Sequence, residues 1–425
     1  MSTPRALADW LSHIQAQHPQ AIAMGLDRVR AVAGRLGLQR PAARVITVGG
    51  TNGKGSTVAF IEAIGRAAGW KVGAYTSPHL LRYNERVRID GAQADDAALV
   101  EAFEAVEAAR GEIALTYFEY GTLAALWLFQ RSALDLAILE VGLGGRLDAV
   151  NVVDPDVAVI TTVDVDHTEW LGPDRDSIGR EKAGIARAWK PLVLGEVSIP
   201  GTVLRHAYAI AAAVIQGGND FFHEPLEDGR WRWREVGYEL ELPALPLDAP
   251  VQRANAATAI AAVRALDGGE ALAPAVFASG VAQATVPGRL QRLERDGVEI
   301  RLDVGHNPQA ARALADWLQA HPVQGPTVAV FAALADKAVE EVVQALAPHI
   351  ARWQLAGIDD AGPRSLSAEQ LLQRAPTLQG RAVLHETVAQ AVEAAVAQAG
   401  PAGRVLVFGS FHTVGQALAA LHSHK

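Results

Sequence analysis

The chain has 425 residues, of which 50% are hydrophobic and 20% charged, and its formal net charge is −9. This composition is typical of a globular protein with more than one domain, and it excludes a disordered, collagen-like or coiled-coil chain. The acidic balance excludes a general nucleic-acid coat. Because the chain has no cysteine, disulfides, thiolate zinc sites and a cysteine nucleophile are excluded too.

No segment is long and apolar enough to predict a membrane span. The longest apolar stretches, Thr122–Phe129 and Ala207–Ile215, fall well short of the roughly 20 residues that a span requires. The N-terminus lacks a secretory pattern, because Asp9, His13 and Gln15 interrupt what would have to be an apolar core. We therefore expect a cytoplasmic protein that binds neither a membrane nor nucleic acid.

The spacing of apolar residues predicts an α/β fold that begins with a strand at Arg44–Val48. A turn of small residues, Gly49–Thr57, follows, and then a helix at Val58–Ala68 and a strand at Val72–Tyr75. Strand, Gly-rich turn, helix and strand in this order open a parallel sheet. Further predicted elements are helices at Asp95–Arg110, Tyr117–Gln130 and Val251–Leu266, strands at Leu134–Leu139 and Val157–Ile160, and a hairpin within Trp231–Leu242.

Pro287 and Gly288 follow a helical pattern and precede a new strand, which marks a linker. Beyond this linker, strands and helices alternate again. The predicted elements are Val298–Val304, Pro308–Ala320, Thr327–Phe331, Lys337–Ala347, Trp353–Ala356, Thr387–Ala399, Arg404–Phe408 and Val414–His422. We therefore predict two domains, residues 1–286 and a smaller α/β domain of residues 287–425.

The turn Gly49–Thr57 has the composition of a phosphate-binding loop. In such a loop, backbone N–H groups and the helix dipole attract the anion, and Lys54 places a positive charge near the terminal phosphates. The strict pattern is not met, because Val48 stands where the first glycine belongs and Gly55 separates Lys54 from Ser56. A tight turn without a ligand is the alternative.

The loop sequence Gly-Thr-Asn-Gly-Lys-Gly-Ser resembles the ATP loop of the folylpolyglutamate synthase and dihydrofolate synthase family, a branch of the Mur-type amide ligases. Further motifs of the family follow in the family's order over most of the chain: Gly25–Val29, Thr76–Leu80, Asn84–Arg88, Thr116–Glu119, Glu140–Asp148, Asp164–His167, Glu181–Ile185 and Asp303–Pro308. Two positions depart from the family pattern: Val304-Gly305 replaces the usual Gly-Ala, and Val150 replaces a frequent Thr.

The resemblance implies a two-domain α/β architecture. The N-terminal domain would be a P-loop-type ATPase domain with a parallel sheet, similar to the central domain of Mur ligases. The C-terminal domain would be smaller and Rossmann-like. The resemblance also implies ATP as a substrate and Mg²⁺ at two sites, with K⁺ as a further cation.

The metal ligands that the resemblance implies are Ser77, Glu140, His167 and Lys182. Glu140 ends a predicted strand, where a carboxylate of an α/β sheet points into the ligand crevice, and Mg²⁺ prefers oxygen ligands. Lys182 is implied to be carbamylated, which requires a neutral amine that captures CO₂. The residues alone leave alternatives: an ion pair of Glu140 with Arg146 or Arg180, a core or capping role for His167, and a solvated helix lysine at Lys182.

The resemblance places ATP between residues of both domains. The implied ATP-binding residues are Thr51, Asn52, Gly53, Lys54, Gly55, Ser56, Asn255, Arg289 and Asp303. The implied catalytic residues are Lys54, Lys182 and His306. Arg289 by itself could equally be a surface residue.

Three segments match those that line the dihydropteroate site in bacterial members with both activities. They supply Ile22, Ala23, Met24, Thr116, Tyr117, Phe118, Glu119, Leu147, Asp148 and Ala149. Tyr117 and Phe118 can offer flat apolar surfaces to a pterin, and the Glu119 carboxylate can accept hydrogen bonds from it. The two aromatic residues could equally belong to the core under the predicted helix.

These features predict ATP-dependent ligation of L-glutamate to dihydropteroate and to reduced folates through an acyl phosphate, by a monomer. The alternatives are a folylpolyglutamate synthase with that activity alone, a Mur-type cell-wall ligase and an ATP-gated switch without chemistry. About 49 residues precede the loop, which is too few for the first domain of a cell-wall ligase. The joint presence of Lys54, Glu140 and Lys182 argues against a switch.

Overall fold

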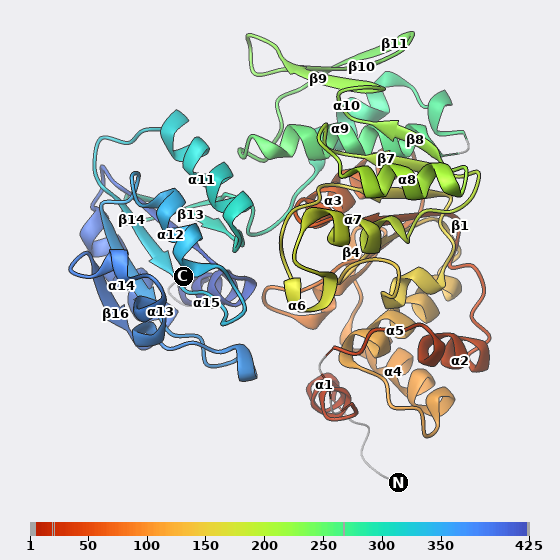
Figure 1. The fold of residues 1–425 in the computed structure, drawn as a ribbon, viewed down its shortest axis with the longest axis horizontal. Helices are drawn as coiled ribbons and strands as arrows, with labels where there is room; N and C mark the ends of the chain where they lie inside the picture. The colour runs from red at the N-terminus through yellow and green to blue at the C-terminus, as the bar shows by residue number, and fades with distance from the viewer. Residues whose placement is uncertain (1–5, 19, 21, 267, 423–425) are drawn as a thin grey trace. The chain divides into compact units, whose positions relative to one another are not determined.

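The computed structural model describes residues 6–18, 20, 22–266 and 268–422. The chain divides into two compact units (Figure 1). The larger unit holds the chain up to Pro246 together with Gln252–Thr285, and the smaller unit holds Leu247–Val251 and the chain from Val286 onward. The segment Leu247–Val251 belongs to the smaller unit because Asp248 accepts a hydrogen bond from Arg301, which lies on a strand of that unit.

An eight-stranded sheet forms the centre of the larger unit, in the order β4-β3-β2-β5-β1-β6-β7-β8. Its strands are β1 (Ala42–Gly49), β2 (Val72–Tyr75), β3 (Val87–Ile89), β4 (Ala92–Gln93), β5 (Leu134–Glu140), β6 (Val157–Ile160), β7 (Pro191–Leu194) and β8 (Ala213–Gln216). The strands from β2 to β8 in this order run parallel, whereas β3 pairs antiparallel with both β2 and β4. The register pairs Val48 with Glu140 and Tyr75 with Leu139, so β1, β2 and β5 end at one edge of the sheet.

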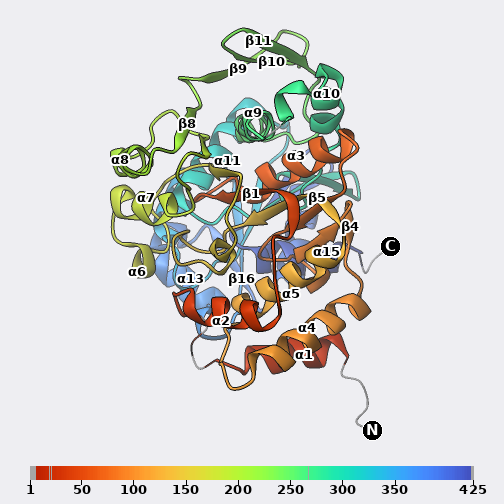
Figure 2. The same cartoon turned by 90° about the vertical axis from the view of Figure 1, so that its right-hand side faces the viewer.

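Helices cover the larger unit's sheet. They are α1 (Leu7–Gln15), α2 (Asp27–Arg35), α3 (Lys54–Ala67), α4 (Asp96–Arg110), α5 (Tyr117–Arg131), α6 (Thr168–Leu171), α7 (Arg175–Ala183), α8 (Gly201–Ala209), α9 (Val251–Arg264) and α10 (Pro274–Gln283), with 3-10 turns η1 (Tyr83–Arg86), η2 (Ala149–Val152) and η3 (Gly269–Ala271). Helix α5 contacts β2 and β5, and α4 and α1 pack outside it (Figure 2). Helix α10 packs closely on α3, because a Cβ at Gly280 would lie 2.5 Å from the Ile64 Cα.

The predicted hairpin is confirmed, and a third strand joins it. Strands β9 (Phe221–Pro225), β10 (Trp231–Glu235) and β11 (Tyr238–Leu242) form a separate antiparallel sheet beside α9 and α10 (Figure 1). The alternation of apolar and polar residues in β10 buries Trp231 and Trp233 on one face. The indole of Trp233 also donates a hydrogen bond to the Ala257 carbonyl of α9.

The smaller unit contains a six-stranded sheet in the order β12-β13-β17-β14-β15-β16. Its strands are β12 (Gln291–Arg295), β13 (Val298–Asp303), β14 (Thr327–Phe331), β15 (Arg352–Ala356), β16 (Ala382–His385) and β17 (Arg404–Phe408). All run parallel except β12. The helices are α11 (Pro308–Ala320), α12 (Val339–Leu346), α13 (Ala368–Arg374), α14 (Val388–Ala399) and α15 (Phe411–His422), with turns η4 (Gly362–Arg364) and η5 (Pro376–Leu378). The rings of Phe331, Trp353 and Phe408 pack against one another in its core.

The helix that carries Lys182 is shorter than the sequence predicts. The sequence pattern predicts a helical stretch over Ser177–Ala188, whereas α7 spans Arg175–Ala183. Side chains bind the carbonyls beyond this point, since Asn151 donates to Gly184 and Arg187 donates to Ile185 and Ala186. Over the described residues, no helix is long and apolar enough to cross a membrane.

Candidate active site

The phosphate loop joins β1 to α3 and is held by residues that follow β6. The Thr51 amide donates to the Thr162 carbonyl at 2.8 Å, and the Asn52 amide donates to the Thr162 hydroxyl at 3.0 Å. Gly50 has a φ of +145°, and a Cβ there would lie 1.8 Å from the Thr161 hydroxyl, so the loop requires glycine at this position. The Lys54 Nζ donates to the loop carbonyls of Gly50 and Thr51 at 3.0 and 3.3 Å.

Asn255 lies directly against this loop, although it belongs to α9. A Cβ at Gly53 would be 2.5 Å from the Asn255 Oδ1, and Gly53 has a φ of +87°. The Asn255 Nδ2 donates to Gln252 at 3.1 Å, which orients the amide. The structure therefore brings the predicted ATP residue Asn255 to the start of α3.

Ser77 and Glu140 meet at the edge of the sheet beside the loop. The Ser77 amide donates to the Glu140 carboxylate at 3.2 Å. Glu140 is only 5% exposed, as expected for a carboxylate at the end of a buried parallel strand. Because β5 lies between β1 and β2, the register that pairs Glu140 with Val48 sets this carboxylate next to the phosphate loop.

Lys182 is 3% exposed and lies on the last turn of α7. Burial, together with the positive charge of Lys54, lowers the pKa of Lys182 to about 7, although Asp166 and Asp148 act in the opposite direction. The two lysines therefore lie within electrostatic reach of each other. A buried amine with this pKa is largely neutral at a slightly alkaline pH.

His167 precedes α6 in the left-handed conformation, with a φ of +53°. Its amide donates to the Asp166 carboxylate at 2.8 Å, and its Nε2 is 3.9 Å from the same side chain. Among the described residues, no three His, Asp or Glu side chains form a ready metal cluster. The four predicted metal ligands would not form such a cluster, because two of them, Ser77 and Lys182, are neither His, Asp nor Glu.

Asp148 is buried in the loop that follows β5. Its carboxylate accepts hydrogen bonds from the amides of Leu143 and Val150, at 2.9 and 3.1 Å. Burial outweighs these bonds and raises the pKa of Asp148 to about 7. Since the charge of Lys54 also acts on Asp148, this side chain lies near the phosphate loop as well as in a predicted pterin segment.

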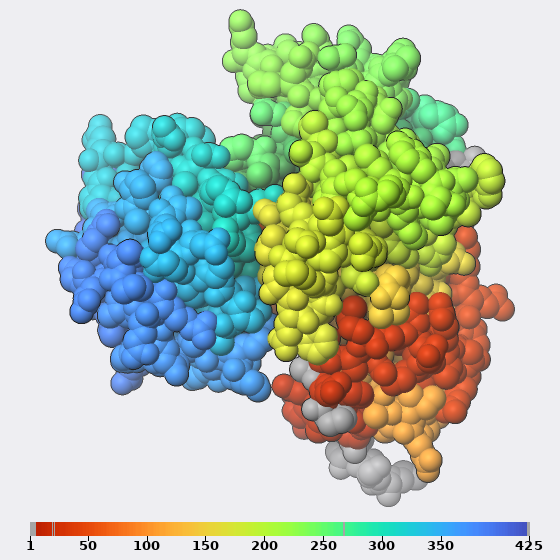
Figure 3. Space-filling view, in the orientation of Figure 1, coloured from red at the N-terminus to blue at the C-terminus, as the bar shows by residue number. Residues whose placement is uncertain are grey.

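The predicted pterin residues come together from three parts of the larger unit. The ring of Phe118 lies over Gly142, where a Cβ would be 2.7 Å from it, and 6.0 Å from the ring of Tyr75. The Met24 methyl group lies near Gly144, and the Gly25 amide donates to the Leu147 carbonyl at 3.5 Å. On the face of the larger unit shown in Figure 3, the red N-terminal part of the chain lies beside the yellow part.

The Glu119 carboxylate accepts hydrogen bonds from other residues of the protein. Its carboxylate accepts bonds from Arg28 at 2.8 Å and from the Thr116 amide at 2.8 Å, which closes a capping box on α5. Arg28 also donates to the Ala23 carbonyl at 2.7 Å. In this arrangement Glu119 holds the loop Ala23–Gly25 in place through Arg28.

The smaller unit brings Arg289, Asp303 and His306 together at the end of β13. Asp303 accepts hydrogen bonds from the Leu290 and Gly305 amides at 2.8 and 2.7 Å. Burial raises the pKa of Asp303, while the charges of Arg289 and His306 act to lower it. The imidazole Nδ1 of His306 lies 3.0 Å from the Val304 carbonyl.

Three residues around the site have no role in the sequence-based prediction: Asp166, Arg28 and Arg86. Each lies inside one of the sequence motifs that carry the family resemblance, and this position in a motif is the signal that could have found it. Two of them contact residues of other segments: Arg28 bonds Glu119, which is 91 residues away, and Arg86 lies over the ring of Tyr117. A single sequence does not reveal such pairs.

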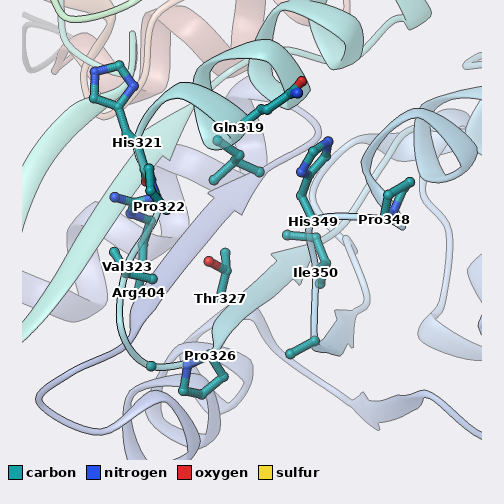
Figure 4. A pocket seen from close by; sticks show the side chains of 13 residues that line it. Gln319, His321, Pro322, Val323, Pro326, Thr327, Pro348, His349, Ile350 and Arg404 are labelled. Carbon is teal, nitrogen blue, oxygen red and sulfur yellow. The ribbon is translucent and has the colours of Figure 1, made fainter.

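A pocket of about 520 Å³ opens elsewhere in the smaller unit (Figure 4). It is lined by Thr327 and Arg404, which begin β14 and β17, and by His321 and His349 from neighbouring loops. Asp303 lies at the opposite edge of the same sheet, where β13 ends. None of the predicted site residues lines this pocket.

Two domain families define the class of protein. Residues 48–194 match the Mur ligase middle domain, and residues 288–411 match the Mur ligase glutamate ligase domain. The dihydrofolate synthase/folylpolyglutamate synthase of Escherichia coli K12 is 45% identical over 426 residues, which cover 100% of this chain and 98% of the relative.

Solved structures agree with this result. A structure described as E. coli FolC in complex with DHPP and ADP has a TM-score of 0.92 at 45% identity, covering 99% of this chain and 98% of the other. A bifunctional folylpolyglutamate synthase/dihydrofolate synthase with Mn, AMPPNP and L-glutamate bound has a TM-score of 0.89 at 43% identity, with 98% of both chains covered. The chain belongs to the dihydrofolate synthase/folylpolyglutamate synthase family. The predicted family, fold class and class of enzyme, an ATP-dependent amide-forming ligase, are thereby confirmed.

Proposed function

We propose that this protein uses ATP to join L-glutamate to dihydropteroate, which gives dihydrofolate, and to reduced folates, which gives polyglutamates. The observation that carries the proposal is the convergence at one sheet edge of the phosphate loop and the Ser77–Glu140 pair, with the buried Lys182 in electrostatic reach of Lys54. Relatives at 45% and 43% identity are described with DHPP and ADP, and with AMPPNP, Mn and L-glutamate.

The reaction has two steps. The substrate carboxylate attacks the γ-phosphorus of ATP, the bond to the β–γ bridging oxygen breaks, and ADP leaves with the electron pair. The neutral amine of glutamate then attacks the acyl carbon of the acyl phosphate. The bond to phosphate breaks, inorganic phosphate leaves, and the new amide nitrogen loses a proton.

Lys54 and the loop amides would neutralise charge on the transferring phosphoryl group. Both are positioned before the substrate arrives, since Lys54 is held by the Gly50 and Thr51 carbonyls and the amides lie at the start of α3. Fixed positive groups of this kind stabilise a phosphoryl-transfer transition state without reorganisation. Thr51, Asn52, Gly53, Gly55, Ser56 and Asn255 complete the proposed ATP contacts of the larger unit.

Arg289, Asp303 and His306 are the proposed contributions of the smaller unit. Asp303 carries a carboxylate and is therefore suited to hydroxyl or amino groups of the nucleotide, not to its phosphates. Arg289 and His306 are suited to the phosphates or to the acyl phosphate. This assignment requires the two units to act on one nucleotide, as two-domain enzymes do on closure.

The donor set fits a divalent cation. The Glu140 carboxylate and the Ser77 hydroxyl are hard oxygen donors on residues that adjoin through the Ser77 amide, and Mg²⁺ takes one or two protein carboxylates together with phosphate oxygens. We assign Ser77, Glu140, His167 and a carbamylated Lys182 as ligands, at two sites, with K⁺ as an additional cation. When bound, Mg²⁺ would supply positive charge to the phosphate oxygens.

Carbamylation of Lys182 needs a neutral amine, which adds to the carbon of CO₂ and releases one proton. Burial provides this, because it lowers the pKa of Lys182 to about 7. The product is an anion, which replaces an unfavourable buried cation next to Lys54 by a favourable charge pair. Lys182 is thus a proposed ligand and not a proton donor.

The pterin is assigned to the surface formed by Phe118, Tyr117 and the segments around Met24 and Asp148. The far end of the Phe118 ring lies against Gly142, and Asp148 offers a carboxyl group next to it. Ile22, Ala23, Thr116, Leu147 and Ala149 complete this proposed lining. Glu119 would act on the pterin through the loop that Arg28 holds.

The function is tested by ADP release from purified protein supplied with ATP, Mg²⁺, L-glutamate and either dihydropteroate or tetrahydrofolate. We expect release with both acids, no release without glutamate, and products that mass spectrometry shows to have gained one glutamate. Turnover with tetrahydrofolate but not with dihydropteroate would mean that the protein has the folylpolyglutamate synthase activity alone. Slow ATP hydrolysis that ignores both pterins and glutamate would contradict the proposal and favour an ATP-gated switch.

We further propose that the protein acts as a monomer in the cytoplasm on these small-molecule substrates. Light scattering on a size-exclusion column and fractionation of cells test the two statements. A stable dimer under assay conditions would contradict the first of them.

A further inference from the structure

Arg86 is a buried cation without an acidic partner in the part of the chain that the structure describes. It lies at the end of η1 and is 9% exposed. Among the residues that the structure describes, it forms no ion pair with a carboxylate. Buried charges in proteins are ordinarily paired, because an unpaired one loses its hydration without compensation.

The side chain of Arg86 is held by aromatic rings. Its guanidinium carbon lies 5.3 Å from the centre of the Tyr83 ring and 5.4 Å from that of Tyr117. Its Nε donates to the Nδ1 of His79 at 2.8 Å. Neither Nη group donates a hydrogen bond to any described residue. The guanidinium is therefore held in a fixed orientation, and its two Nη groups can donate hydrogen bonds to a ligand.

The next arginine in the same motif shows the ordinary alternative. Arg88 donates to both oxygens of Glu62, with the shortest distance 2.7 Å. Glu85, the acid next to Arg86 in sequence, is not available as a partner. Its carboxylate accepts hydrogen bonds from the amides of Leu80, Leu81 and Arg82 at 2.7 to 2.8 Å.

Arg86 lies between the two parts of the proposed active site. Its carbonyl accepts a hydrogen bond from the Thr76 amide at 2.9 Å, and the next residue, Ser77, is bonded to Glu140. On its other side Tyr117 begins α5, next to Phe118. A substrate that reaches from the aromatic surface to the phosphates would therefore pass Arg86.

We propose that the Nη groups of Arg86 bind a carboxylate that glutamylated pterins carry and dihydropteroate lacks, the α-carboxylate of the terminal glutamate. Dihydropteroate has a single carboxylate, which reacts with ATP. A folate has a second, unreactive carboxylate close to the reacting one. When the reacting carboxylate loses its hydration in the site, this second carboxylate loses its hydration too. A planar guanidinium matches a carboxylate in a bidentate manner. This inference rests on the proposed function and specifies its second substrate.

The test compares two substrates in one variant, Arg86→Gln. We expect the ratio of the KM for tetrahydrofolate to the KM for dihydropteroate to rise about 10- to 100-fold, the range for a lost charge-assisted hydrogen bond. Arg86→Lys keeps the charge without the fork and should give a smaller rise. The control is Arg35→Gln, which removes an exposed guanidinium bonded to the α4 carbonyls of Ala109 and Arg110. Its ratio should match the wild type.

A second measurement does not depend on folding of a variant. In the wild type, replacing the α-carboxylate of the folate by a carboxamide should raise KM as much as Arg86→Gln does, and in Arg86→Gln this replacement should have little further effect. An equal rise of KM for both substrates, or an unchanged ratio, would overturn the inference, as would full activity of the carboxamide in the wild type. If the wild type turned over neither substrate, the proposed function itself would fail.

Discussion

Lys54 illustrates how a single side chain can matter for the reaction and little for the fold. Its Nζ donates to the loop carbonyls of Gly50 and Thr51, and it lies at a helix start, where the helix dipole does not favour a positive charge. We expect Lys54→Ala to lower kcat about 100-fold or more with both substrates, as loss of a transition-state donor does, with an unchanged melting temperature.

The control for this prediction is Lys71→Ala, which removes an exposed lysine of the same unit. It should leave kcat within about twofold of the wild type, since exposed charges contribute little. Steady-state ADP release with each substrate provides both values. Retained turnover in Lys54→Ala would refute the phosphate-loop assignment.

Lys182 tests whether a lysine acts as an anion. If it carries a carbamate, Lys182→Ala and Lys182→Arg should both lose nearly all turnover, and a short carboxylic acid should restore part of it only in the Ala variant. Enzyme freed of CO₂ should regain activity on addition of bicarbonate at pH 8, where an amine with a pKa of about 7 is neutral. A fully active Ala variant, or a bare amine seen crystallographically in metal-bound enzyme equilibrated with bicarbonate, would contradict this role.

At the scale of elements, the ion pair between Arg28 of α2 and Glu119 of α5 positions the loop Ala23–Gly25. Arg28 binds Glu119 on α5 and the Ala23 carbonyl, so Arg28→Gln releases the loop that carries Met24. We expect the KM for dihydropteroate to rise several-fold, while the KM for ATP stays constant, because neither hydrogen-bond partner of Arg28 belongs to the phosphate loop. Arg35→Gln, on the same helix, is the control. Equal changes in both KM values would indicate a general loss of structure.

Helices α1, α4 and α5 are joined through Glu107, which accepts hydrogen bonds from His13, Tyr120 and Arg110. Burial acts to raise the pKa of Glu107, but these bonds outweigh it and lower the pKa to about 2. A carboxyl group whose pKa is lowered in the folded state stabilises it above its unfolded pKa, and this contribution declines as pH falls from about 5 toward 2.

Glu107→Gln should therefore lower the free energy of unfolding by about 1 kcal/mol at pH 7, a value reduced for the partial exposure of the group. The difference from the wild type should shrink between pH 5 and pH 3. Urea unfolding at several pH values measures it. A difference that grows on acidification would contradict the assignment.

The elements themselves were predictable where periodicity is strong. Strands such as Val157–Ile160 and Thr327–Phe331 and the helix Pro308–Ala320 have the predicted bounds, because buried parallel strands and amphipathic helices leave clear patterns. The strands β3, β4, β7 and β8 were missed, because each has only two to four residues and includes a polar residue or a proline, which interrupts the apolar run.

The composition of the site was less predictable than its location. The end of β1 and the end of β5 mark the sheet edge that holds Lys54 and Glu140, and chain order predicts this much. The unpaired state of Arg86 beside the paired Arg88 depends on Glu62, a residue of α3. No local pattern distinguishes two arginines separated by one residue on the same stretch of chain.

For the whole molecule, the question is whether the smaller unit contributes to nucleotide binding. Its Asp303 is buried at the end of β13, beside Arg289 and His306, and two backbone amides hold its carboxylate. Asp303→Asn keeps an acceptor oxygen for one of these two amides and removes the charge. We expect the affinity for ATP to fall about 10-fold, the effect of weakening a charge-assisted hydrogen bond to a ligand.

Isothermal titration with a non-hydrolysable ATP analogue measures this affinity. The control is Asp316→Asn, an exposed aspartate on α11 of the same unit, which should bind the analogue as the wild type does. A melting temperature equal to that of the wild type would show that Asp303→Asn still folds. Lys54 and Asp303 belong to different units. If Asp303→Asn lowers the affinity for ATP and Asp316→Asn does not, and Lys54→Ala loses turnover as predicted, both units bind one nucleotide. Unchanged affinity and turnover would mean that the larger unit binds ATP by itself.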